Sequence, residues 1–365
     1  MPYSFTVFGE DWGRHPSSTQ HIFKHMVRDN DIHWINSIGM RSPKLCVKDI
    51  SRIFEKGRSY LKKNNVKVVT GTEPKVYQPR LLPFHGSKIV QYLNKKLFKP
   101  QSTSVLWTSL PTSVYLHENL RPSCTVYYCC DDFDALEGVD HKMVATHEKT
   151  LAKQADIIFT INKDLAKKFP SHKTHILDHG VDYELFSTPQ DRPKDLPHRK
   201  KIAGFYGSIQ SWLDLGLIES LAKELSDWTF VFIGTVHVDV RALKTYPNIY
   251  FLGPKKHHEL PAYVQHWNVS LLPFKNTKQI KACNPLKLKE YMTAGAPIVS
   301  TRFPAVEMFE DLVHVTDKKG FSKAIKEALN EESGQKIIRQ TIMKQHSWEV
   351  RAQYVQDIIS AHLMA

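Results

Sequence analysis

The 365-residue sequence has few cysteines and no long run of apolar residues. Its five cysteines include the adjacent Cys129 and Cys130 but no Cys-x2-Cys pair, so we expect reduced structural thiols rather than a disulfide framework or a zinc site. No stretch approaches the ~20 consecutive apolar residues that span a bilayer. Residues 1–4 also lack the charged and apolar regions of a signal peptide. We therefore expect a cytoplasmic protein.

Acidic residues are outnumbered: 37 Asp and Glu stand against 50 Lys and Arg, which gives a formal net charge of +13 beside 19 His. Such a charge attracts nucleic acid, anionic lipid headgroups or phosphorylated substrates. Much of it lies in the first hundred residues, at Lys56, Arg58, Lys62, Lys63, Lys67, Lys88, Lys95, Lys96 and Lys99. These segments predict either a solvated face or a face that docks on an anionic membrane, which would place the protein peripherally at the inner face of the cell membrane.

The sequence is rich in short apolar strands that alternate with amphipathic helices. The expected strands are 3–8, 32–35, 66–69, 104–107, 124–129 and 157–160, followed by 202–206, 229–233, 249–252, 269–272 and 297–300. Helices are expected between them, among others at 47–63, 141–154 and 215–225. This alternation predicts α/β structure with parallel sheets covered on both faces.

The length exceeds what one hydrophobic core usually supports, so we expect two Rossmann-like doubly wound domains. Residues 187–200 contain three prolines among charged residues and fit neither a helix nor a strand, which predicts a linker. The expected division is a domain at 1–186, the linker at 187–200, a second domain at 201–345 and a C-terminal helix at 346–365 that packs back on the first domain.

Glycines follow three successive strands of the second domain. Gly207 and Ser208 follow the first of them, Gly234 the second and Gly253 the third. Ligands of open parallel sheets bind beyond the carboxyl ends of the strands. Glycine there lets backbone N–H groups approach a phosphate, although each glycine alone also fits an ordinary tight turn.

The most informative run extends from Asn284 to Ser300 and reads Asn-Pro-Leu-Lys-Leu-Lys-Glu-Tyr-Met-Thr-Ala-Gly-Ala-Pro-Ile-Val-Ser. Within it Lys287 and Glu290 are three residues apart and share one helix face, a spacing that surface ion pairs also use. The run resembles the Pro-x-Lys-x-x-Glu-Tyr-x-x-x-Gly-x-Pro-Val-Val signature of GT-B glycosyltransferases of group 1. Looser blocks along nearly the whole chain are similar to bacterial exopolysaccharide, teichuronic-acid-type and capsule glycosyltransferases.

The resemblance implies a GT-B fold in which the two domains face each other across a cleft and close about the linker. It implies a hexosyltransferase-type enzyme that moves a sugar from a nucleotide diphosphate, with UDP-sugars favoured, to a polysaccharide or lipid-linked glycan. The second domain would bind the donor: Glu290 would hold the ribose hydroxyls and Lys287 the diphosphate, beside Gly207, Ser208, Gly234, Gly253 and Asn284. Many retaining members have another Glu where this chain has Ala282. No metal and no cofactor are expected.

Two adjacent carboxylates, Asp131 and Asp132, follow the strand 124–129. Mutual repulsion would raise one pKa towards the range of a general base, which an inverting transfer needs. Capping of a following helix is the alternative role. Asp132, Phe133 and Asp134 also form the Asp-x-Asp motif of another glycosyltransferase fold, which two doubly wound domains do not suit.

Acceptor contacts are expected in the first domain. Asp11 and Trp12 lie in a loop that matches the resemblance, and His21 and His25 lie one helical turn apart behind it. The two histidines, like His117 and His179, also fit ordinary exposed positions.

Other function classes remain open from the sequence. A nucleotide-sugar epimerase or a phosphorylase would have the same two-domain architecture. A nucleic-acid-binding protein would explain the positive charge, but the aromatic residues do not alternate with the basic clusters as a stacking surface requires, so no nucleic acid is expected.

Overall fold

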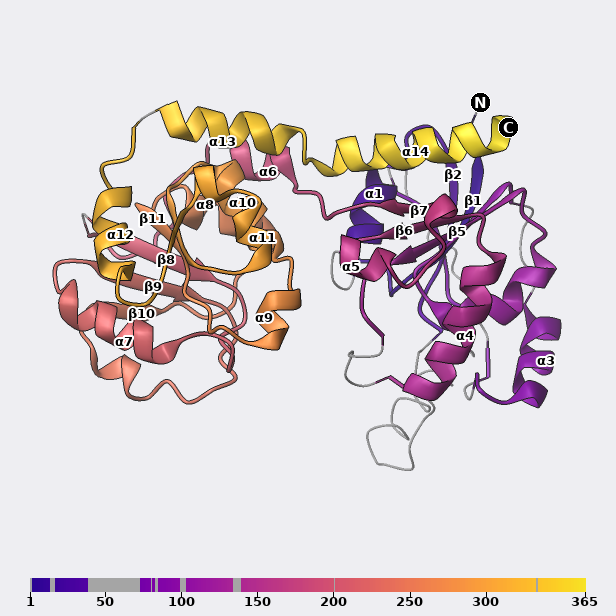
Figure 1. Cartoon of the computed structure of the whole chain (residues 1–365), viewed down its shortest axis with the longest axis horizontal. Helices are drawn as coiled ribbons and strands as arrows, with labels where there is room; N and C mark the ends of the chain where they lie inside the picture. Colours follow the sequence, from indigo (N-terminus) through magenta and orange to yellow (C-terminus); the bar gives the residue numbers. More distant parts are fainter. Residues whose placement is uncertain are drawn as a thin grey trace. The chain divides into compact units, whose positions relative to one another are not determined.

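The computed structural model describes residues 2–13, 17–38, 73–79, 81–82, 85–98, 103–133, 139–199, 201–332 and 334–365. The chain divides into two compact units. The first comprises Met1–His179 together with Trp348–Ala365, and the second comprises Gly180–Ser347 (Figure 1). Residues 187–200, which the sequence assigned to a linker, lie inside the second unit, where Leu196 is buried in the core.

The first unit is built on a seven-stranded parallel sheet with the order β3-β2-β1-β4-β5-β6-β7. Its strands are β1 (Ser4–Phe8), β2 (Asp31–Ile35), β3 (Lys75–Tyr77), β4 (Val105–Thr108), β5 (Cys124–Cys129), β6 (Ile157–Thr160) and β7 (Thr174–Ile176). Its helices are α1 (Ser18–Met26), α3 (Lys88–Leu97), η1 (Pro111–Asn119), α4 (His141–Gln154), α5 (Lys163–Ala166), η2 (Ser171–Lys173) and α14 (Trp348–Met364).

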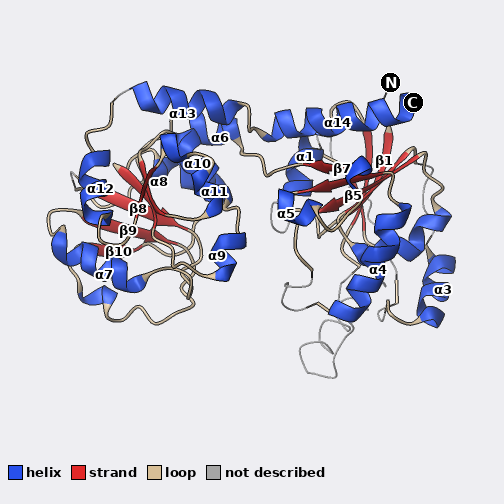
Figure 2. Cartoon of the chain, in the orientation of Figure 1, coloured by secondary structure: helices blue, strands red, loops and turns tan. Residues whose placement is uncertain are grey.

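The second unit is built on a six-stranded parallel sheet with the order β10-β9-β8-β11-β12-β13. Its strands are β8 (Ile202–Tyr206), β9 (Thr229–Ile233), β10 (Ile249–Phe251), β11 (Val269–Leu272), β12 (Ile298–Thr301) and β13 (His314–Thr316). Its helices are α6 (Tyr183–Ser187), α7 (Leu215–Glu224), η3 (Leu243–Thr245), η4 (His257–Glu259), α8 (Leu260–Val264), α9 (Lys278–Ala282), α10 (Leu286–Ala294), α11 (Pro304–Glu307), η5 (Glu310–Leu312), α12 (Phe321–Ala328) and α13 (Gly334–Lys344). Helices lie on both sides of the sheet, as Figure 2 shows.

The predicted α/β class with doubly wound parallel sheets is confirmed. The sequence missed the edge strands β3, β7 and β13, because each has only three residues and carries polar side chains. The expected helix at 47–63, the expected strand at 66–69 and the lysines and arginines at 56–67 lie outside the described residues. Within the described residues, no helix is long and apolar enough to span a bilayer.

The last helix of the chain belongs to the first unit. Helix α14 packs on α1, where the rings of Trp348 and His21 stack 4.9 Å apart and nearly parallel. Trp348 is 3% exposed. An apolar contact of this kind holds the chain's two ends in one core.

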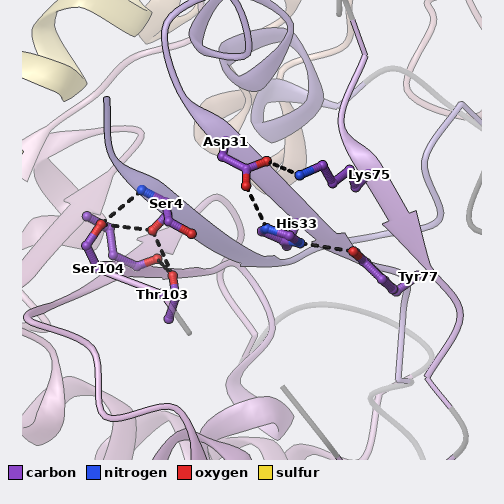
Figure 3. A network of polar contacts seen from close by, with 8 residues as sticks. Ser4, Asp31, His33, Lys75, Tyr77, Thr103 and Ser104 are labelled. Carbon is purple, nitrogen blue, oxygen red and sulfur yellow. Dashed lines mark hydrogen bonds and ion pairs between the residues drawn. The ribbon is translucent and has the colours of Figure 1, made fainter. Parts of the chain in front are cut away.

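A polar network ties the strands of the first sheet together at their amino ends (Figure 3). Asp31 forms an ion pair with Lys75 at 2.7 Å and a hydrogen bond with His33 at 3.1 Å. Burial alone would raise the pKa of Asp31, but the hydrogen bonds from Lys75 and His33 lower it below its usual value. The other nitrogen of His33 lies 3.1 Å from the Tyr77 hydroxyl, so the network fixes the register of edge strand β3.

Candidate functional site

Three neighbouring strands of the second sheet are followed by glycines with positive φ angles, a backbone conformation that disfavours a side chain. Gly207, Gly234 and Gly253 have φ angles of 132°, 142° and 72°. The N–H of Gly207 donates to Ile233 at 2.8 Å, and the N–H of Gly234 donates to Gly253 at 2.9 Å. A Cβ atom on Gly234 would lie 2.1 Å from the carbonyl oxygen of Gly207. The carboxyl edge of the sheet is therefore bare backbone at these positions, and the space beside Gly253 is open.

Lys287 extends from the first turn of α10 to this bare edge. A Cβ atom on Gly207 would lie 2.7 Å from the Lys287 ammonium nitrogen, so a side chain there would displace the cation. The nitrogen lies 5.1 Å from the ring centre of Phe205, 5.2 Å from that of Trp212 and 5.7 Å from that of Phe274. These three rings form an aromatic cage that holds the ammonium by cation–π attraction.

The cage also changes the proton affinity of the amine. Burial among the rings lowers the pKa of Lys287 to about 8, although the negative charge of Glu290 acts in the opposite direction. Lys287 remains mostly protonated at neutral pH, as a cation in poorly solvated surroundings. Such a charge attracts an anion more strongly than a surface lysine does.

Glu290 lies one turn further along α10 and is 8% exposed. One carboxylate oxygen accepts a hydrogen bond from the Tyr206 hydroxyl, and the other lies 2.8 Å from Nε2 of His257. Burial and the charge of Glu290 raise the pKa of Tyr206 well above its usual value, so this hydroxyl stays a donor. The carboxylate is thus fixed in orientation by β8 and η4.

His257 was not among the residues predicted from the sequence. It lies four residues beyond Gly253, after the third glycine-ended strand, and its ring also packs on Phe186 at 5.5 Å. Its position after β10 was a usable signal, but nothing local indicated the contact with Glu290, which is 33 residues away.

Ser208 and Asn284 flank this arrangement. Ser208 is exposed directly after Gly207, and Asn284 is half-buried just before α10. Pro285 occupies the N-cap position of α10 and makes no side-chain capping hydrogen bond. The first N–H groups of a nine-residue helix therefore lie beside Lys287, and helix N-termini favour anions.

In the first unit, the end of β5 places two carboxylates in different surroundings. Asp132 forms an ion pair with Lys168 at 2.9 Å. The pKa of Asp131 is raised, first by burial and then by the negative charge of Glu10, which follows β1. The neighbouring charge is thus Glu10 and not the expected Asp132. Asp134, the last residue of the Asp-x-Asp tripeptide, lies outside the described residues.

The loop after β1 is held to the end of β2. A carboxylate oxygen of Asp11 accepts from the backbone N–H of Ser37 at 3.2 Å. The N–H of Trp12 donates to Asn36 at 3.0 Å, and its ring packs on Trp34 at 4.8 Å. Asp11 and Trp12 are half-buried at the carboxyl edge of the first sheet.

The four histidines named from the sequence are less exposed than expected. His21 is 7% exposed because Trp348 stacks on it, and His25 is half-buried. Burial lowers the pKa of His117 to about 3, so that ring is neutral and bonds the Ser113 hydroxyl at 2.9 Å. His179 is half-buried and contacts the Ser18 hydroxyl at 2.7 Å. Packing inside the first unit accounts for His21 and His117, whose exposed placement was wrong.

A separate group of possible metal ligands lies at the opposite, amino end of the first sheet. The ligand atoms of Cys124, Asp156 and His362 lie within 4.8 Å of one another. Cys124 begins β5 and Asp156 precedes β6, so this group is not part of the carboxyl edge that carries Asp131.

Known proteins resemble this chain in sequence over part of its length. Residues 201–331 match the family model described as glycosyl transferases group 1. A putative teichuronic acid biosynthesis glycosyltransferase, TuaH of Bacillus subtilis strain 168, is 29% identical over 226 residues, which cover 56% of this chain and 57% of that protein. The chain therefore aligns with little more than half the length of this relative.

Solved structures resemble the whole chain. A crystal structure of Anabaena Alr3699/HepE in complex with UDP and glucose has a TM-score of 0.63 at 13% identity, with 98% of this chain and 99% of that one covered. Sucrose-phosphate synthase from Thermosynechococcus elongatus has a TM-score of 0.66 at 12% identity, with 99% of each chain covered. At such identities the likeness concerns the fold, which is GT-B. Residues 201–331 thus match the group 1 glycosyl transferase model, within a chain of the GT-B fold.

Proposed function

We propose that this protein is a glycosyltransferase that moves a sugar from a nucleotide diphosphate sugar to a glycan acceptor. One observation carries the proposal: the caged Lys287 ammonium lies against Gly207 at a strand edge of bare backbone, with Glu290 fixed one helical turn away. A cation, a helix N-terminus and a held carboxylate are what a nucleoside diphosphate requires of its site.

The departing nucleoside diphosphate gains negative charge as the bond to the sugar breaks. Lys287 would stabilise this charge together with the N–H groups that begin α10, without reorganisation at the moment of reaction. Glu290 would accept hydrogen bonds from the ribose hydroxyls through its remaining lone pairs, since Tyr206 and His257 occupy one direction on each oxygen.

The acceptor hydroxyl needs a base if the transfer inverts configuration. Asp131 is our candidate, because its raised pKa makes it a stronger base than an ordinary aspartate. Asp132 is already paired with Lys168 and suits that role less well. Asp11, Trp12 and His25 are proposed to contact the acceptor. The proposal includes no resident metal or cofactor, so activity should persist in a chelator.

Similar proteins support a choice of substrates. The HepE structure was solved in complex with UDP and glucose, and TuaH is named for teichuronic acid synthesis. We propose a UDP-sugar donor and a surface polysaccharide or lipid-linked glycan of a bacterium as acceptor, such as a capsule or exopolysaccharide precursor. A net charge of +13 suits a cytoplasmic enzyme that works peripherally at an anionic membrane.

Two experiments test the proposal. In thermal unfolding with UDP, GDP, ADP or CMP, a ligand of the folded state raises the melting temperature, and we expect UDP to raise it most. Donor consumption is then compared between the wild type, Lys287→Ala and Glu290→Ala. Unchanged turnover in both variants would remove the donor-site assignment, and product formation that needs no acceptor would indicate an epimerase instead.

A further inference from the structure

Helix α3 of the first unit is amphipathic in the reverse sense of an ordinary surface helix. Four of its five apolar side chains face solvent: Ile89 is 74% exposed, Tyr92 57%, Leu93 41% and Leu97 53%. The spacings of three and four residues place all four on one stripe of the helix. Surface helices normally turn such a stripe to the core, so this exposed stripe needs a separate explanation.

Hydrogen bonds from polar side chains hold the inner face of α3. Asn94 is fully buried, its amide donates to Leu82 at 3.0 Å and to the Tyr115 hydroxyl at 3.1 Å, and its oxygen accepts from Leu82 at 2.7 Å. Gln91 donates to the His85 carbonyl at 2.6 Å. A helix turned about its axis would lose these bonds and leave a buried amide unsatisfied. The outward direction of the apolar stripe is therefore built in.

The surroundings of the stripe are basic. Helix α3 contains Lys88, Lys95 and Lys96 and no acidic residue, and Lys96 lies over the Tyr92 ring at 4.6 Å. Helix α4, which a hydrogen bond from Gln91 to His147 joins to α3, exposes further lysines and no carboxylate. Figure 1 shows α3 at the outer edge of the first unit. Two acids of the described part of the chain lie in this region: Glu118, which pairs with Lys95, and Asp140, whose carboxylate caps α4.

A shallow groove of about 560 Å³ runs between α3, η1 and α4. Lys88, Lys95 and Lys142 line it together with Gln91 and Thr146. The groove therefore lies on the inner side of α3, and its lysines flank the exposed apolar stripe. Cations beside such a stripe match the chemistry of a bilayer surface, where phosphate groups lie above the acyl chains.

We infer that α3 docks the protein on an anionic lipid bilayer, with Ile89, Tyr92, Leu93 and Leu97 inserted at the level of the acyl chain ends and the lysines among the headgroups. Tyrosine suits this depth because its ring is apolar and its hydroxyl is polar. Lysine side chains reach the headgroups while their stems stay on the apolar surface. The inference deepens the proposed function and rests on it, because a lipid-linked acceptor lies at a membrane.

The test is partition of the full chain onto vesicles of phosphatidylcholine with or without phosphatidylglycerol. We expect binding to the anionic vesicles that weakens as salt rises, and little binding to neutral ones. The variant Ile89→Ser/Leu93→Ser/Leu97→Ser should bind at least tenfold more weakly. Lys88→Gln/Lys96→Gln should bind more weakly with a smaller dependence on salt. The matched control is Ile337→Ser/Met308→Ser, which removes equally exposed side chains (66% and 67%) of the second unit and should bind as the wild type does.

Thermal unfolding with and without UDP is measured on the same samples. The α3 variants should keep the wild-type melting temperature and UDP response, since their changed side chains face solvent. The inference is wrong if the wild type and the serine variant bind vesicles equally, or if the wild type does not bind them. A rise of the melting temperature with UDP would still support the proposed donor site in that case. A wild-type dimer that the serine variant converts to a monomer in sedimentation velocity also overturns the inference, because a second copy would then cover the stripe. Vesicle binding without a thermal response to UDP, GDP, ADP or CMP would instead refute the donor site.

Discussion

Replacing Lys287 by methionine should make the protein more stable without ligand and less able to bind its donor. The ammonium lies among the rings of Phe205, Trp212 and Phe274, and its pKa falls from 10.5 in water to about 8. At 1.36 kcal/mol per pKa unit, this shift corresponds to a cost of about 3 kcal/mol to the folded state at neutral pH. Methionine has a similar length and no charge, so it fills the cage without this cost, and the cation–π attraction that it loses, about 2 kcal/mol, is smaller.

The sign of the pH dependence follows from the same numbers. The folded state holds the Lys287 proton less tightly than the unfolded state, so the unfolded state binds more protons between about pH 8 and 10.5. This residue's contribution to stability therefore rises with pH in that window, and Lys287→Met should remove the rise. Donor binding changes in the opposite direction, because only the cation attracts a diphosphate. The value of kcat/KM should fall about tenfold per pH unit above about pH 8.

Urea unfolding without nucleotide and pH profiles of kcat/KM measure these effects. Lys281→Met, on the exposed side of α9, is the matched control and should change neither. Trp212→Leu removes one ring of the cage and admits water, so the alkaline limb of the profile should move to higher pH. A loss of stability in Lys287→Met relative to the control, or an alkaline limb that Trp212→Leu leaves in place, would refute the reasoning.

Three further predictions concern the strand edges and the last helix. Gly234→Ala places a Cβ atom 2.1 Å from the Gly207 carbonyl oxygen at a φ of 142°, so it should lower the free energy of unfolding by about 1–3 kcal/mol or more in urea titrations. Activity should fall as pH drops through the raised pKa of Asp131, which must be ionised to act as a base, and Glu10→Gln should shift this acid limb of the pH profile to lower pH. An unchanged limb would remove Asp131 as the base. Trp348→Ala removes a side chain that is 3% exposed and should cost about 3–5 kcal/mol of unfolding free energy; a loss below 1 kcal/mol would show that the stack on α1 is dispensable.

Local patterns in the sequence predicted the strands and the glycine edge. Strands β8 and β9 begin and end at the expected residues, because apolar runs bounded by glycine carry their own signal. Gly207 and Gly234 could be found for the same reason. Edge strands of three residues that combine polar and apolar side chains, such as β13, have no comparable pattern.

Contacts between residues far apart in the sequence could not be predicted. His257 reaches Glu290 across 33 residues, and the Glu10 charge acts on Asp131 from another strand of the sheet. The cage around Lys287 combines a strand residue, a loop residue and a residue after β11, and its spacing fits no local template. No predicted helix covered residues 88–97, and the buried hydrogen bonds of Asn94 decide which face of α3 turns inward.

Buried charge alone does not mark a functional residue in this chain, as Arg339 shows. Arg339 is 1% exposed, yet its guanidinium pairs with Glu331 through two nitrogens and donates to the Gly295 carbonyl at 2.9 Å. Burial would raise the pKa of Glu331, but the hydrogen bonds from Arg339 lower it to about 2, so each charge is compensated. Lys287 instead meets three rings, and its pKa falls.

This difference is what separates a structural ion pair from a site prepared for a ligand. A fold that keeps a poorly compensated cation gives up stability at neutral pH, and the exposed apolar stripe of α3 likewise forgoes burial that the helix could have had. Both features are costs in the isolated molecule. In the two proposals, a bound anion offsets the free-energy cost of the buried Lys287 ammonium, and the interior of a bilayer offsets the cost of the exposed stripe on α3. The two deviations are the structural basis of the proposed donor site and of the inferred membrane contact.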